Sequence, residues 1–273
     1  YESFEAIEPP PPPGEKLRIQ PSGLTYEFET FRRESFNEWW QMAREALRQG
    51  NSEAKLWFEG WGRFDYLLRH GMDQLGTFQR ADMAAVHSGA ASEVQRVWGY
   101  SLSRVTGTLL CDGETITSGD YYQGGCASLQ QLAAAAQYHL LAHVWFGARA
   151  FMFWTGTLTM NRVYSYGGPY LYDGDYLSPV SSSSAAVALV RRKADLYEPI
   201  LATTKIVHPQ VGILFSSTSF VNSWPYNEVE HETYPFHAWL HQSDFGYFYL
   251  HEDLVADGRE DLMFYKVILA PWA

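Results

Sequence analysis

Four short apolar runs, each ending on a residue that can take part in chemistry, constrain this chain more than any other feature. They are Leu56–Glu59, Met83–His87, Thr108–Glu114 and Ala148–Trp154. A stretch with helix-like spacing separates each run from the next, and this repeated alternation predicts a parallel sheet with covering helices. Because parallel strands end at one edge, the terminal residues of these runs are expected to line a common site, which points to an enzyme.

The elements expected between residue 36 and about residue 200 follow the order αβαβαβαβα. Helices are predicted at Phe36–Gln49, Asp73–Arg80, Ser92–Arg104, Leu129–Trp145 and Ala185–Leu196. Strands are predicted at Lys55–Glu59, Met83–His87, Thr108–Asp112 and Ala150–Trp154. This order is typical of the second half of a (β/α)₈ barrel, whose active site lies at the C-terminal ends of its strands.

The pattern restarts after residue 204. Strands are expected at Val211–Phe215, Tyr247–Leu250 and Lys266–Ala270, with a helix-like stretch at Tyr234–Gln242. This βαβ…β order predicts the opening of a small doubly wound domain. The Gly and Ser residues near 212–219 do not form a GxGxxG motif, so a dinucleotide site is not supported. We therefore expect two domains, at residues 1–203 and 204–273.

Composition limits the class of function. A net charge of −11 gives no electrostatic footprint for nucleic acid, and no basic amphipathic segment suggests a membrane surface. Aromatic residues make up 16% of the chain, which fits either a large core or a sugar-binding cleft. Cys111 and Cys126 form no disulfide framework and belong to no cluster with metal-ligand spacing, so no zinc site is expected.

Glu114 is the residue most in need of explanation. A carboxylate at a strand end suits nucleophilic attack on an anomeric carbon when a second carboxyl lies roughly 5–5.5 Å away. An exposed loop glutamate is the alternative. The Asn37-Glu38 pair resembles a glycosidase acid/base dipeptide, but it lies inside a predicted amphipathic helix, so we interpret it as solvated helix surface.

Five further residues are candidates for contact with substrate. Trp154 is either a core aromatic or a platform beneath a sugar ring, and His87 is either structural or a hydrogen-bond partner of substrate. Glu59, with Trp61 just beyond it, is as compatible with a loop salt bridge as with substrate contact. Tyr122 follows Glu114 and is either a cleft residue or part of a plain loop.

Several segments resemble the β-galactosidases of glycoside hydrolase family 42 (GH42) and their clan A relatives, which have TIM-barrel catalytic domains. The similar segments are FNEWWQMAREALR, GMDQLGTFQRADMAAVH, TLLCDGE and GARAFMFWTGT, and downstream KIVHPQVGILFS through YKVILAPWA. The resemblance implies barrel strands five to eight, preceded at the N-terminus by the end of strand four and followed by the start of a flavodoxin-like trimerisation domain.

By the same resemblance, Glu114 ends the seventh strand as the nucleophile, Trp154 ends the eighth and His87 the sixth. The acid/base is expected at the end of the fourth strand, where Glu8 is the available carboxyl, although Ile7 stands where the family has Asn. The implied activity is retaining hydrolysis of β-galactosides or related β-linked sugars, with no cofactor. A non-catalytic carbohydrate-binding or scaffold protein that retained the barrel is the alternative.

The length of the chain falls short of a complete barrel plus a second domain. We therefore expect a part of a longer protein, in which the complete molecule is a homo-oligomer, by resemblance a trimer. Residues 1–273 alone are expected to be aggregation-prone and inactive, because a half-barrel leaves apolar strand edges unpaired. The cellular compartment stays open.

Overall fold

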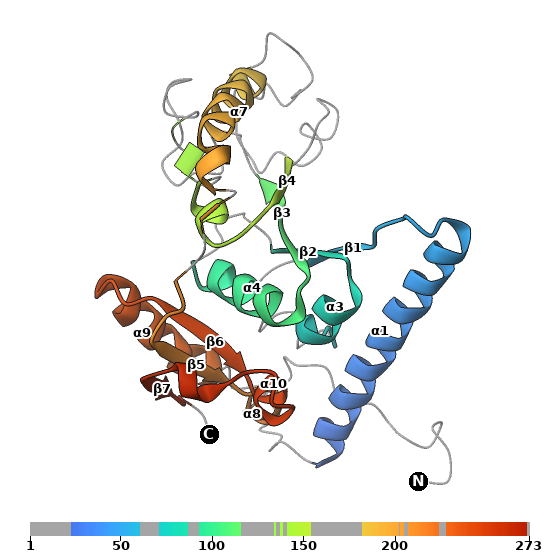
Figure 1. Cartoon of the computed structure of the whole chain (residues 1–273). Helices are drawn as coiled ribbons and strands as arrows, with labels where there is room; N and C mark the ends of the chain where they lie inside the picture. Colours follow the sequence, from blue (N-terminus) through green and yellow to red (C-terminus); the bar gives the residue numbers. More distant parts are fainter. Residues whose placement is uncertain are drawn as a thin grey trace, which may run out of the picture.

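The computed structural model describes residues 23–60, 71–86, 93–115, 134, 137–138, 141–153, 182–201, 203–204, 207–223 and 228–271. Helices alternate with parallel strands in these ranges, which confirms the predicted α/β class (Figure 1). None of the helices in the described ranges combines the length and the apolar character needed to cross a bilayer.

A four-stranded sheet forms from the four apolar runs. Its strands are β1 (Trp57–Gly60), β2 (Met83–Val86), β3 (Leu109–Thr115) and β4 (Ala150–Phe153). All neighbours are parallel and the order is β1-β2-β3-β4, so each strand lies beside the next one in sequence. Sequential parallel strands of this kind require a crossover between each pair, which the intervening helices provide.

A second, three-stranded parallel sheet follows. It contains β5 (Val211–Phe215), β6 (Tyr247–His251) and β7 (Val267–Leu269) in the order β6-β5-β7. The first strand of this sheet therefore lies in the middle, with later strands added on either side, which is the arrangement of a doubly wound sheet. All three strands lie within or overlap the runs predicted from sequence.

The helices with described bounds are α1 (Gly23–Gly50), α3 (Gln74–Arg80), α4 (Glu93–Thr106), α7 (Ser182–Leu201), α8 (Ser217–Ser223), α9 (Glu228–Gln242) and α10 (Glu252–Ala256), with a 3₁₀ turn η2 (Leu262–Phe264). Residues 134, 137–138 and 141–145, within the predicted helix Leu129–Trp145, are also helical. Two of the helices, α8 and α10, were not predicted. Two others, α1 and α9, begin well before the predicted starts at Phe36 and Tyr234. The early part of α1 is held by tertiary contact, since Arg33 Nη1 donates to Ser217 Oγ at 3.3 Å.

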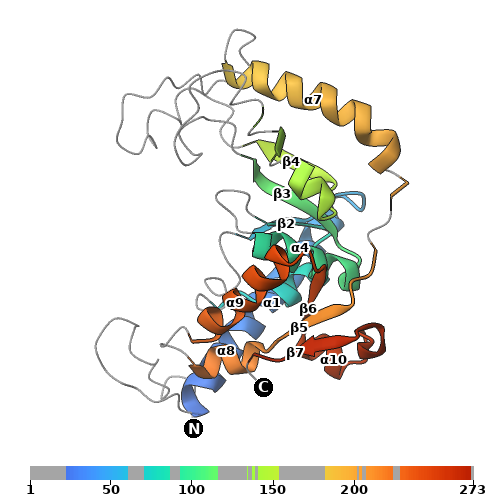
Figure 2. The ribbon, with the colours of Figure 1, turned by 90° about the vertical axis from the view of Figure 1, so that its left-hand side faces the viewer.

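Helix α4 packs against both sheets, which lie on opposite sides of it in both views (Figures 1 and 2). Toward the first sheet, Gly99 allows a close approach: a Cβ at this position would lie 2.4 Å from Cγ1 of Val86. Toward the second sheet, Trp98 contacts Phe215 with ring centroids 4.6 Å apart. One apolar core therefore continues from the first sheet through α4 into the second.

The contact between α1 and α3 corrects one expectation about Asn37. Asn37 lies within a helix, as predicted, but it is buried rather than solvated. Its Nδ2 donates to Oδ2 of Asp73 at 3.1 Å, and a Cβ on Gly76 would lie only 2.2 Å from that nitrogen. The neighbouring Glu38 is exposed. The polar Asn37 therefore belongs to the helix–helix contact, because Gly76 brings α3 within its reach.

Candidate active site at the carboxyl edge of the first sheet

The parallel strands of the first sheet bring their C-terminal ends to one edge. The register pairs Glu59 with Ala85 and Ala85 with Cys111, so these three residues form one row across β1, β2 and β3. Cys111 pairs in turn with Ala150 of β4. The predicted strand-end residue Glu59 therefore stands in a continuous row near the edge where enzymes of this architecture place their chemistry.

An irregularity in β3 contains Glu114. Asp112 pairs with Phe151 and Thr115 pairs with Phe153, so β3 advances three residues while β4 advances two. Thr115 therefore occupies the register position opposite Phe153 that Glu114 would hold in a regular strand. Bulges of this kind bend a strand and redirect its residues, and they are frequent beside active sites.

The helix-covered face of the sheet is closed. Ala84, Val86 and Leu110 belong to the same buried core as Val97 and Trp98 of α4. Because residues alternate between faces along a strand, Ala85 and Cys111 lie on the opposite face. Both are buried as well, which confirms the interpretation of Cys111 as a small core residue.

The opposite ends of these strands are anchored by Asp82. Its carboxylate accepts from Arg48 Nη2 at 2.7 Å and from the Leu56 N–H at 2.9 Å, and Arg44 lies 3.4 Å away. Burial favours the neutral carboxyl, but the Leu56 N–H and the two guanidinium groups outweigh it and lower the pKa of Asp82. A carboxylate held ionised in this way ties α1 to the starts of β1 and β2.

The structure describes the backbone position of only some of the predicted site residues. Glu59 lies in β1 and Glu114 in β3, both near the carboxyl edge, while the positions of their side chains are outside the description. The other predicted residues lie outside the described ranges: Glu8, Trp61, His87, Tyr122 and Trp154. The roles assigned to all seven therefore stay predictions, although β2 and β4 are described up to the residues directly before His87 and Trp154.

A polar cluster at the carboxyl edge of the second sheet was missed from sequence. The carboxylate of Glu252 accepts from the hydroxyls of Ser216 and Ser217 and from the Thr218 N–H, the last at 2.7 Å. Burial acts to raise the pKa of Glu252, but these donors outweigh it and lower the pKa. The run Ser216–Ser219 directly after a predicted strand was the signal that could have indicated this cluster.

The contacts of that cluster within the described residues give it a structural role. Glu252 uses both of its oxygens on donors at the start of α8, so it serves as a capping group for that helix. The neighbouring His251 is buried against Trp98 and Phe215, and burial lowers its pKa, so the neutral ring predominates near pH 7. Within the described ranges, no group of three or more His, Cys, Asp or Glu residues is arranged to hold a metal ion.

Comparison with known proteins identifies the fold. No protein-family profile and no curated protein matches the sequence. Among solved structures, the β-galactosidase of the psychrophile Marinomonas ef1 superposes with a TM-score of 0.65 at 12% identity, covering 99% of this chain and 43% of that chain. The cold-adapted β-galactosidase of Rahnella sp. R3 gives 0.64 at 14% identity, covering 99% and 40%. A GH42 β-galactosidase gives 0.61 at 15% identity with the same coverage.

The chain shares the fold of the GH42 β-galactosidases. It spans about two fifths of the length of these relatives. This agrees with the resemblance drawn from the segments around the four strands and from the restart near Val211. The TM-scores of 0.61 to 0.65 show the shared fold, and identities of 12 to 15% leave the activity to be argued from the site.

Proposed function

We propose that this chain is part of a retaining glycoside hydrolase that acts on β-galactosides or related β-linked sugars. The observation that carries the proposal is the superposition on three β-galactosidases over almost the whole chain. The second support is Glu114 itself, a carboxylate in an irregular part of β3 near the carboxyl edge of a parallel sheet. Enzymes with this architecture use that edge for catalysis.

In the proposed assignment, β1 to β4 are strands five to eight of a (β/α)₈ barrel. The parallel order β1-β2-β3-β4 supports it, because adjacent strands of such a barrel follow one another in sequence. Residues 1–203 then belong to the catalytic domain, and residues 204–273 begin a flavodoxin-like domain. The β6-β5-β7 order of the second sheet supports the latter. The complete protein is proposed to assemble as a homotrimer.

The proposed reaction needs two carboxyl groups and no cofactor. The Glu114 carboxylate attacks the anomeric carbon while a protonated carboxyl, for which Glu8 is the candidate, donates its proton to the glycosidic oxygen. The bond to the leaving group breaks and a glycosyl–Glu114 ester forms. The second carboxylate then removes a proton from water, which attacks the anomeric carbon, releases the sugar and restores both groups.

The irregularity in β3 supports the choice of Glu114. In a regular strand, position 114 would share the face of Leu110, which is covered by α4. The register shift between Asp112 and Thr115 interrupts this alternation, so the face of Leu110 is no longer fixed for position 114. The remaining candidates are proposed to contact the substrate: Glu59, Trp61, His87, Tyr122 and Trp154.

Covalent trapping in the complete protein tests the nucleophile. A 2-deoxy-2-fluoro-β-galactoside with a good leaving group slows breakdown of the intermediate, so a labelled peptide spanning residues 109–115 is expected after proteolysis and mass spectrometry. Glu114→Gln should lose both the label and turnover while the far-UV spectrum is retained. Glu59→Gln is the matched strand-end control and should still be labelled. A label on Glu59, or turnover by Glu114→Gln, would contradict the assignment.

Azide rescue separates the two carboxyl roles. With an activated β-galactoside, Glu114→Gly plus azide should yield the α-galactosyl azide, because azide attacks from the face of the missing nucleophile. Glu8→Gly plus azide should yield the β-galactosyl azide, because azide replaces water in the second step. If Glu8→Gly retains full activity, the acid/base is another group. Sugar binding without hydrolysis by the complete wild-type protein would instead favour the non-catalytic alternative.

A further inference from the structure

Two neighbouring residues of the loop that follows α10 contact the last turn of α4. Glu260 accepts from Nη2 of Arg104 at 2.7 Å and 2.5 Å through its two carboxylate oxygens. Arg259 donates from Nη2 to the Val105 carbonyl at 3.1 Å. One contact thus pairs a charge of the helix, and the other supplies a donor to a carbonyl oxygen at its C-terminal end, where intrahelical partners are lacking.

Glu260 is built into this contact. Its side chain is almost completely buried, and Oε1 also accepts from the Tyr265 hydroxyl at 2.8 Å. Burial, together with the hydrogen bond and negative charge of Glu260, raises the pKa of Tyr265, so its hydroxyl stays protonated as a donor. A buried carboxylate with three such contacts is costly to disturb, because losing its charge would leave Arg104 without its counter-ion.

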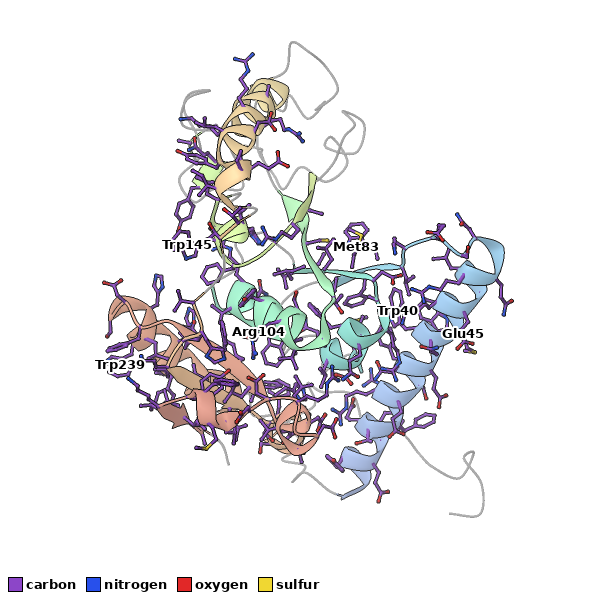
Figure 3. All side chains as sticks on the ribbon, viewed as in Figure 1. Trp40, Glu45, Met83, Arg104, Trp145 and Trp239 are labelled. Carbon is purple, nitrogen blue, oxygen red and sulfur yellow. The ribbon has the colours of Figure 1, made fainter. Side chains whose placement is uncertain are left out.

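The loop that contacts α4 has a backbone conformation held by hydrogen bonds to α10. Gly258 adopts φ +68°, and the N–H groups of Arg259 and Glu260 both donate to the Leu254 carbonyl, at 2.9 Å and 3.0 Å. The loop is therefore tied to α10, the helix that directly follows β6 of the second sheet. Arg104 lies between α4 and that sheet (Figure 3). Both contacts therefore come from the segment that connects β6 and β7 of the second sheet.

The last turn of α4, which the loop contacts, leads directly into β3. Gly107, with φ +74°, ends the helix, and Ser103 Oγ donates to the Thr108 carbonyl at 2.6 Å. The Thr108 hydroxyl donates to the Phe78 carbonyl, and the Leu109 N–H to the Asp82 carbonyl at 3.3 Å. A shift of the end of α4 would therefore move the first residues of β3 relative to β2.

We infer that Glu260 is a positioning residue, which holds the α4–β3 turn in place from the second sheet and so sets the position of β3. The inference rests on the proposed function in one respect, that β3 carries the nucleophile Glu114. Glu260 itself lies at the opposite end of β3 from Glu114, so it acts through the strand and takes no part in the chemistry. The second sheet thereby becomes a support for the catalytic strand.

Hydrogen exchange and kinetics on the complete protein test this inference together. In Glu260→Gln, amides 109–115 are expected to exchange at least about tenfold faster, and kcat to fall about three- to tenfold with KM unchanged, because small displacements of catalytic groups are costly. Tyr265→Phe removes one donor and keeps the ring, so it should give the same changes at smaller size. Asp195→Asn is the matched control, since it breaks the exposed Arg191–Asp195 pair of 2.7 Å.

The outcomes separate this inference from the proposed function. Faster exchange confined to the second sheet at 247–251, with 109–115 unchanged, would overturn the positioning role. So would faster exchange in β3 with wild-type kcat. If the wild-type protein hydrolyses no galactoside but β3 exchange rises in Glu260→Gln, the support of β3 stands and the proposed activity fails. If Glu260→Gln does not fold, Tyr265→Phe decides by the same two measurements.

Discussion

The indole of Trp98 packs edge-on against the ring of Phe215, with centroids 4.6 Å apart and planes inclined by 66°. The first residue belongs to the helix that covers the first sheet, and the second is the last residue of the central strand of the second sheet. Tyr249 joins them at 5.5 Å from Trp98, and its N–H donates to Ser101 Oγ at 3.0 Å. The stability of each sheet therefore depends on the contacts that α4 makes with the other sheet.

Phe215→Ala is expected to destabilise both sheets together. Removing a fully buried aromatic ring costs about 3–5 kcal/mol, and the cavity would open onto Trp98. Urea unfolding of the complete protein, followed by hydrogen exchange in β2 and β5, should report parallel losses. The matched control is Phe264→Ala, an exposed ring, which should cost less than about 1 kcal/mol. A loss confined to β5 would show that the two sheets are uncoupled.

Asp244→Gly is expected to stabilise the protein by about 0.5–1 kcal/mol. Asp244 has φ 55° at the end of α9, where the Phe245 N–H donates to the Leu240 carbonyl and the Asp244 N–H to the His241 carbonyl. This end structure favours glycine at position 244, and the relief of strain exceeds the added freedom of the unfolded chain. Thermal unfolding measures the gain.

The control for that substitution is Asp257→Gly at the end of α10. Asp257 has φ −76°, which any residue adopts, so glycine there brings only the entropic cost. A loss of stability is expected. Equal effects at 244 and 257 would contradict the strain assigned to Asp244.

Gly76→Ala is expected to cost about 1–3 kcal/mol, because a Cβ would lie 2.2 Å from Nδ2 of Asn37 and 2.4 Å from its Oδ1. Asn37→Ala alone should also be destabilising, since it removes the bond to Asp73. The double variant should lose less than the sum of the two single losses, because alanine at 37 leaves room for the new methyl group. Additive losses in chemical denaturation would contradict this packing.

His237 predicts a pH dependence of stability. Burial, followed by the charge of His241, lowers the pKa of His237 to about 4 from 6.5. The unfolded chain therefore binds a proton in this window that the folded chain does not, so stability is highest above pH 6.5 and is lost as the pH falls toward 4. The unfolding midpoint of the wild type should decline over this range.

His237→Phe isolates that contribution. The phenyl ring keeps the contact with Tyr247, whose ring centroid lies 5.4 Å from that of His237, and it removes a buried Nδ1 that has no hydrogen-bond partner among the described residues. The variant should be at least as stable at pH 7 and lose less stability toward pH 4. The exposed His241→Gln removes only the smaller cause of the shift, so it should reduce the slope less than His237→Phe does. An unchanged slope in His237→Phe would refute the assignment.

Residues 1–273 expressed alone are expected to self-associate and to lack hydrolase activity. Large apolar side chains are exposed on α1, including Trp39 and Met42, and Trp239 lies on the outer side of α9 (Figure 3). Light scattering and galactoside hydrolysis test this. A monomeric, active preparation would contradict the expectation.

All seven described strands were predicted from sequence because each is a short apolar run between glycine- or polar-rich segments. The missed elements depend on contacts distant in the chain. Helix α8 begins where Glu252, the residue directly after β6, accepts from the Ser217 hydroxyl and the Thr218 N–H. The burial of Asn37 likewise depends on Gly76, which no local pattern around Asn37 indicates.

The candidate site was predicted in outline through its strands. Sequence periodicity placed Glu59 and Glu114 at the ends of apolar runs, and both lie near one edge of a parallel sheet. The irregularity in β3 could not be foreseen, because it is a mismatch between β3 and β4 rather than a property of either. The cluster around Glu252 was missed because its carboxylate comes from a residue 36 positions after Ser216, and only the Ser216–Ser219 run indicated it locally.

The position of α4 between two sheets has a consequence for recombining related enzymes. A chimera joined between residues 203 and 204 would place Trp98, Ser101 and Arg104 of one parent against Phe215, Tyr249 and Glu260 of another. Such hybrids should work when these six positions are transferred as a set. What must be exchanged together is then the set of residues at this interface, and these residues are not contiguous in the sequence.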